Sequence, residues 1–189
     1  MKKILLIAVA ALFSVAVSAQ DYKFAYVDFT ELVQLMPEMD SARVQIDAAG
    51  AEAQETYQAM VEEYQTKAQQ YQQKAATWTP AIRESKEREI MDIQTRLEQT
   101  QQSLQQEMQQ LQNSLQAPIY EKAQSVVNAL AKGQGVAAVF EVSSMLYLDP
   151  EQLVNLTPDA RVALGIPEDR TIESLQAELQ AKAQASQMM

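Results

Sequence analysis

Hydrophobic positions in the central part of the chain recur every seven residues. One run consists of aromatic residues and the next of aliphatic ones: Tyr57, Tyr64, Tyr71 and Trp78, then Ile90, Leu97, Leu104 and Leu111. Seven-residue spacing sustained over several repeats is typical of helices that pack along one seam. Pro80 divides the runs, since proline disfavours helix at the preceding residue but is accepted in a first turn. The pattern therefore predicts helices over 40–76 and 80–132, with a turn near 77–81.

The two helices are predicted to be the arms of one antiparallel hairpin. A turn centred between Pro80 and Ala81 places each tyrosine of the first arm opposite an aliphatic residue of the second. The facing pairs are Tyr71 with Ile90, Tyr64 with Leu97, Tyr57 with Leu104, and Gly50 with Leu111. This agreement was not built into the two heptad assignments. We therefore predict that the three tyrosines and the four facing aliphatic residues form the arm seam. The alternative, a stripe of rings that stacks on a ligand, is disfavoured because the facing aliphatic row already occupies the rings.

A β-rich segment precedes the arms. The sequence KFAYVDFTEL alternates and is rich in aromatic and β-branched residues, which predicts a strand at Phe24–Phe29. A short helix is expected at Thr30–Leu35, with Thr30 as its N-cap and Pro37 as its end.

A second β-rich segment follows the arms. Val136–Val142 and Met145–Leu148 are apolar runs separated by two serines, and they predict a β-hairpin. The preceding GxG is no phosphate-binding motif, because it leads from a helix into a strand, the reverse of the order such a motif needs.

Two further helices are expected toward the end of the chain. The first lies within Val154–Ile166, with Thr157 as N-cap and Gly165 at the C-terminal cap. The second starts at Thr171 and frays toward residue 189.

These elements define an α+β fold with a long helical hairpin inserted into a small β-body. We expect residues 20–39 and 133–166 to form the body, 40–132 the arm, and 167–189 a C-terminal tail. Three short strands are a small core for arms of this length, which favours oligomerisation.

The first residues have the features of a secretory signal peptide. Lys2 and Lys3 precede an apolar run at Ile4–Val17, and Val17-Ser18-Ala19 resembles a small-residue cleavage site. We expect residues 1–19 to be removed after Ala19 and the mature chain to be exported to the periplasm. A membrane anchor is the alternative, but the run is shorter than the roughly 20 residues that span a bilayer. No later segment is apolar enough to be a transmembrane helix.

Composition and charge argue against several functions. The chain has 15 Lys and Arg against 25 Asp and Glu, which disfavours nucleic acid as a partner. It has no His and no Cys, so no catalytic residue, metal ligand or cofactor is predicted. Residues 64–97 nevertheless carry a net charge of +2. Their basic residues, which either contact clients or only solubilise the arm tips, are Lys67, Lys74, Arg83, Lys86, Arg88 and Arg96.

The order of these parts resembles the Skp/OmpH family of periplasmic chaperones for outer-membrane proteins. The resemblance covers residues 20–166 and rests on four features: the signal peptide, FAYVDFTEL, the inserted hairpin, and VAAVFEVSSMLYLDP followed by VNLTPDARVALGI. It implies a homotrimer with a shared β-core, from which three arms extend around a cavity that holds unfolded outer-membrane proteins without ATP. The interface candidates that it implies are Phe24, Tyr26, Val27, Val139, Phe140, Val142 and Leu146.

Charge separates this chain from the basic, well-studied members of that family. Lipopolysaccharide binding, which a basic surface assists, is therefore not carried over to this acidic chain. The alternative to a chaperone is a structural coiled-coil spacer or assembly factor of the envelope with one fixed partner. A secreted hydrolase is disfavoured by the missing catalytic residue types.

Overall fold

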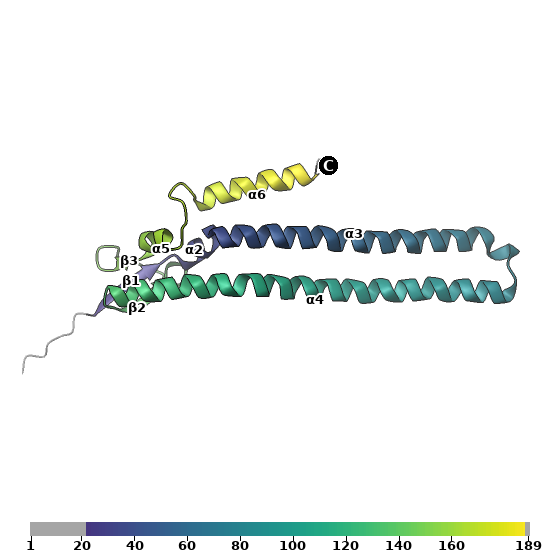
Figure 1. The fold of residues 1–189 in the computed structure, drawn as a ribbon, viewed down its shortest axis with the longest axis horizontal. Helices are drawn as coiled ribbons and strands as arrows, with labels where there is room; N and C mark the ends of the chain where they lie inside the picture. The colour runs from purple at the N-terminus through teal and green to yellow at the C-terminus, as the bar shows by residue number, and fades with distance from the viewer. Residues whose placement is uncertain (1–21, 188–189) are drawn as a thin grey trace, which may run out of the picture.

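The structure, a computed structural model, describes residues 22–187, so the predicted signal peptide lies outside the described residues. Two long helices dominate it (Figure 1): α3 spans Pro37–Lys74 and α4 spans Pro80–Gly133. They lie side by side and antiparallel, joined by the short 3-10 helix Ala75–Thr77. At about 1.5 Å per residue, the 38 residues of α3 extend over about 57 Å. The predicted helical hairpin is therefore confirmed.

Local sequence explains where the long helices begin. Pro37 and Pro80 each occupy the first turn, where the missing N–H costs nothing. At the start of α4, the Thr79 hydroxyl accepts a hydrogen bond from the Ile82 N–H. Pro37 was predicted to end a helix, but it starts α3, one residue after α2 closes. Helix α4 continues through Pro118.

The β-body contains three parallel strands in the order β2-β1-β3. Strand β1 spans Lys23–Val27, β2 spans Val136–Glu141 and β3 spans Val154–Asn155. Both outer strands pair in parallel with β1, so the predicted β-hairpin is wrong. The chain forms a 3-10 turn at Val142–Ser144 instead, where the Ser144 hydroxyl donates to the Glu141 carbonyl oxygen at 2.8 Å. The third strand of the sheet, β3, comes from further along the chain and pairs with the other edge of β1.

Two predicted helix caps are also corrected. Helix α2 spans Phe29–Leu35, and its N-cap is Asp28 rather than Thr30. The Asp28 carboxylate accepts from the Glu31 N–H at 2.7 Å. Helix α5 spans Thr157–Ala163 with Leu156 as N-cap. The Thr157 hydroxyl is used elsewhere, since it accepts from the Asp28 N–H at 2.9 Å and thereby ties α5 to the start of α2.

The core lies where the base of the arms meets one face of the sheet. Ala25 and Val27 of β1 are buried, together with α2 and with Ala123, Val127 and Ala131 of α4. These α4 positions are spaced by four residues, so they lie on one face of the helix. Gly165 ends α5 with a φ of 71°, a left-handed conformation that favours glycine.

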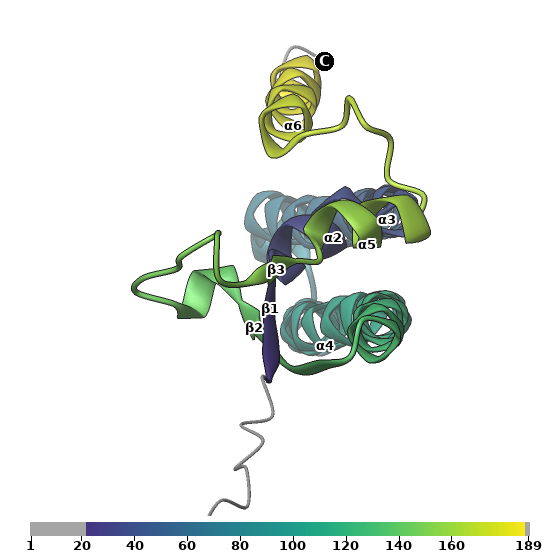
Figure 2. The same ribbon diagram turned by 90° about the vertical axis from the view of Figure 1, so that its left-hand side faces the viewer.

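Helix α6, Ile172–Gln187, lies along the side of α3 that faces away from α4 (Figures 1 and 2). Its first turn is capped reciprocally: Thr171 N–H donates to the Ser174 hydroxyl at 3.0 Å, and Ser174 N–H donates to the Thr171 hydroxyl at 3.2 Å. Leu175 is only 3% exposed, whereas residues 176–185 are exposed. The helix is thus held near its first turns.

Candidate functional site

The outer face of the sheet carries aromatic side chains. Alternation along β1 directs Ala25 and Val27 to the core and Phe24 and Tyr26 to the opposite face. In the register of the sheet, Tyr26 lies beside Phe140 of β2. The rings of Phe24 and Phe140 lie 6.1 Å apart and both are exposed. An apolar, open sheet face is a surface suited to contact with another protein.

The other predicted interface residues are not on this face. Val27 is 3% exposed and belongs to the core, and Val139 packs against the core from β2. Val142 is half-buried in the 3-10 turn. Leu146 lies in the connection from β2 to β3 and is fully exposed, and the neighbouring Tyr147 is 81% exposed. This connection projects away from the helices (Figure 2).

A groove of about 410 Å³ lies between the end of β2 and α4. Its apolar lining includes Phe29 and Tyr120, whose rings are tilted against each other with centroids 6.1 Å apart. Glu141, the only ionisable carboxyl in the lining, accepts a hydrogen bond from the Phe29 N–H at 2.8 Å. Sequence reasoning missed this groove, because its walls come from segments about 90 to 110 residues apart.

The seven predicted seam residues are all half-buried. Ion pairs join the arms along their length, from Glu38 with Lys122 at the base to Glu63 with Arg96 and Lys67 with Glu89 near the tip. The most deeply buried residue of the distal arms is one that the sequence analysis missed, Ile93, at 2% exposed. It follows Ile90 by three residues and precedes Leu97 by four, which is the second seam position of a heptad.

Carboxylates neutralise most of the basic arm tip. Lys67 and Lys86 both pair with Glu89, Arg88 pairs with Glu84 at 2.7 Å, and Arg96 pairs with Glu63 at 3.3 Å. The hydrogen bond from Lys67, and then that from Lys86, lowers the pKa of the Glu89 carboxyl to about 2. Glu89 in turn raises the pKa of Lys67. Four of the six predicted tip residues are therefore engaged within the arm.

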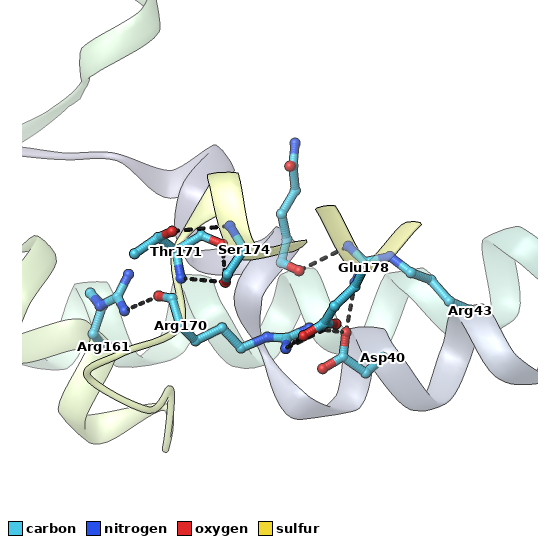
Figure 3. A network of polar contacts seen from close by, with 8 residues as sticks. Asp40, Arg43, Arg161, Arg170, Thr171, Ser174 and Glu178 are labelled. Atoms are coloured by element: carbon cyan, nitrogen blue, oxygen red, sulfur yellow. Dashed lines mark hydrogen bonds and ion pairs between the residues drawn. The ribbon is translucent and has the colours of Figure 1, made fainter. Parts of the chain in front are cut away.

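A network of polar contacts holds α6 against the base of α3 (Figure 3). The Arg170 guanidinium donates to Asp40 of α3 at 2.8 Å and to Glu178 of α6 at 3.2 Å. Arg161 of α5 pairs with Glu31 and donates to the carbonyl oxygens of Pro167 and Arg170. No sequence pattern pointed to this network, because it depends on how the connection between α5 and α6 folds back.

Other kinds of site find no support in the part of the chain that the structure describes. Within residues 22–187, no group of three or more Asp or Glu side chains is arranged to hold a metal ion. None of the described helices is both long and apolar enough to cross a membrane.

Comparison with solved structures supports the architecture. A crystal structure from Caulobacter crescentus CB15, of a candidate outer membrane chaperone (OmpH-like), superimposes with a TM-score of 0.67. The match covers 76% of this chain and 83% of that chain at 10% identity. At this identity the likeness establishes a shared fold. No curated protein matches the chain.

The family assignment comes from the sequence. The model of the OmpH family, described as outer membrane protein (OmpH-like), matches residues 23–160. The match includes the sheet, both arms and the start of α5, and it leaves α6 outside. The chain belongs to the OmpH-like family of outer membrane proteins.

Proposed function

We propose that this chain is an ATP-independent periplasmic holdase, not an enzyme, that binds unfolded outer-membrane proteins and prevents their aggregation. Membership of the OmpH-like family is the observation that carries the proposal. The shape is compatible with it, since two helices of 38 and 54 residues extend from a small body. We further propose that three copies assemble through their β-bodies, so that the arms surround a cavity for the client.

Client contact is proposed to be apolar and weak. The arms carry exposed hydrophobic side chains between polar ones, including Val44 on α3 and Ile82 and Met91 on α4. Scattered apolar contacts tolerate many unfolded sequences, whereas a single deep pocket would select one. Four of the six tip cations are paired with carboxylates, which weakens electrostatic capture of a client.

Aggregation of an unfolded barrel tests the proposal. A urea-unfolded outer-membrane barrel is diluted into buffer with the mature chain, and light scattering is followed over time. The holdase reading predicts that scattering is suppressed without nucleotide, and that Met91→Gln with Ile82→Gln weakens the suppression. Gln94→Ala, an exposed change on the same helix, is the matched control and should behave like the parent.

A structural spacer with one fixed partner is the second candidate. The exposed aromatic side chains of Phe24 and Phe140 are suited to one defined protein contact, which a spacer would need. A spacer would leave unrelated unfolded barrels to aggregate at every ratio of chain to client, and this outcome would reject the holdase.

A further inference from the structure

Two hollows lie along one side of the seam between the arms. They have volumes of about 410 Å³ and 360 Å³, and each is lined by both α3 and α4. Ala49 and Leu111 line the hollow nearer the tip, whereas Ala42 and Pro118, each seven residues away from its counterpart, line the one nearer the base. A shift of seven residues keeps the same side of a helix pair, so the two hollows form one continuous feature. We call it the arm groove.

The arm groove has an apolar floor and a charged rim. Large apolar side chains of α4 line it: Leu104, Met108, Leu111, Leu115 and Ile119. At the hollow nearer the tip, the rim carries one carboxylate from each helix, Glu52 and Glu107, and both residues are exposed. Within residues 22–187, neither of them is paired with a Lys or Arg side chain. This rim therefore presents negative charge to whatever occupies the floor.

The other hollow has an acceptor atom without a donor. The Glu38 carboxylate pairs with Lys122 through its Oε1 atom. Its Oε2 atom is buried and has no hydrogen-bond partner among the described residues. A buried polar atom that lacks a partner is costly, so a donor group supplied by a bound chain would be favourable here.

The arm groove faces a section of the arm that contains no basic residue. Residues 44–66 include five Asp and Glu and residues 97–121 include three, with no Lys or Arg in either segment. Basic residues flank this section, with Arg43 and Lys122 toward the base and Lys67 and Arg96 toward the tip. Charges of one sign along a groove attract segments of the opposite sign and repel segments of the same sign.

Strands of an outer-membrane barrel have a sequence that matches this groove. They alternate apolar and polar residues over about ten positions. The two hollows are seven helical residues apart, which is about 10 Å, and an extended chain covers that distance in about three residues. Apolar side chains of an unfolded strand can therefore reach both parts of the floor, while its polar side chains lie against the rim.

We propose that the arm groove selects client segments in which apolar residues alternate with Lys or Arg. The apolar side chains bind the floor, and the cations pair with Glu52 and Glu107. This inference rests on the proposed holdase function and names the class of client segment that the arm prefers. An acidic chaperone of this shape would then favour clients with basic strands over clients with acidic ones.

Matched peptides test this preference on the whole mature chain. Each fluorescent peptide has about ten residues and alternates apolar residues with Lys, or with Glu in place of Lys. Fluorescence anisotropy should show several-fold tighter binding of the Lys peptide, and the difference should shrink as NaCl rises from about 50 mM to about 500 mM. No binding of the Lys peptide, or equal affinity for the two peptides, would overturn the proposal.

A pair of double variants separates the arm groove from the net charge of the protein. Glu52→Gln with Glu107→Gln should remove most of the preference for Lys without loss of helicity, because both side chains are exposed. Glu151→Gln with Glu168→Gln removes the same charge from exposed positions outside the arm and should keep the preference. Equal loss in both double variants would show that net charge alone attracts the peptide, and would overturn the assignment to the groove.

A dye locates the bound peptide, because the chain has no native cysteine. An environment-sensitive dye is attached to Thr56→Cys, which lies in the groove lining, or to Gln58→Cys, about 200° further around α3. The Lys peptide should change the emission at position 56 several-fold more than at position 58, and the reverse would overturn the assignment. Barrel protection that persists although the two peptides bind equally would reject the groove and leave the holdase standing. A preference for Lys in a chain that protects no barrel would reject the holdase and leave the groove.

Discussion

Replacing Gly50 by alanine should stabilise the arm. Gly50 lies within α3, and positive φ values among the described glycines occur only at Gly135 and Gly165. A Cβ built on Gly50 would meet the Met108 methyl carbon at 4.0 Å, an ordinary van der Waals distance. Glycine in a helix interior is less stable than alanine by about 0.5–1 kcal/mol. The methyl group also adds apolar contact at the arm interface, so we expect a gain of about 1 kcal/mol.

Thermal unfolding followed by circular dichroism measures this gain. For a chain of this size, 1 kcal/mol corresponds to a rise in Tm of roughly 2–4 °C. Protein concentration must be held fixed, because the proposed assembly would change the apparent stability. Gly135→Ala is the matched control with the opposite sign. A Cβ built on Gly135 would meet no atom within 4 Å, but the φ of 68° is strained for alanine, so the Tm should fall. A lower Tm for Gly50→Ala, or a higher one for Gly135→Ala, would refute the reasoning.

Three further predictions concern the arms and α6. The Glu89 carboxyl should titrate near pH 2 by NMR. Because its pKa is lower in the folded state than its ordinary value of 4.5, the Glu89 ion pairs stabilise the fold above pH 4.5, and this stabilisation is lost as the pH falls toward 2. Lys67→Met should raise this pKa, and an unchanged value would reject the ion pair. Ile93→Ala should cost about 2 kcal/mol or more in urea unfolding, because the side chain is buried; a neutral effect would mean that the distal arms are not packed. Arg170→Met and, separately, Leu175→Ala should release α6 and speed proteolysis after residue 170, while equal cleavage of the parent would show that neither residue holds the helix.

The arms could be predicted because the sequence signals of a helical hairpin are local and periodic. The seven-residue spacing of Tyr57, Tyr64 and Tyr71, and the proline at the start of α4, identified two helices and their turn. The same pattern could have identified Ile93. Helix α6 was also predictable, because Thr171 precedes an amphipathic run.

The body was predicted less well because strand pairing is not local. Two apolar runs with serines between them look like a hairpin, yet both neighbours of β1 are parallel to it. Only one of the two cap errors has a similar reason. The Thr157 hydroxyl accepts from the Asp28 N–H, a contact between segments about 130 residues apart. The Asp28 cap is local, since its carboxylate accepts from the Glu31 N–H three residues along, and the sequence could have identified it.

The proposed assembly surfaces could be predicted from the sequence only in part. Phe24, Tyr26 and Phe140 are on the exposed sheet face, whereas Val27 is buried in the core. Alternation along a strand shows which residues share a face, but it does not show which of the two faces is buried. The groove beside Tyr120 and the Arg170 network have no local signature, since each is built from several elements.

Native mass spectrometry of the mature chain, alone and after rapid dilution of a urea-unfolded outer-membrane barrel, tests the central claim most directly. The account predicts a trimer that takes up one client chain and keeps it in solution without nucleotide. A particle whose mass is unchanged by the client, while the barrel aggregates as it does alone, would contradict the holdase and favour a structural spacer.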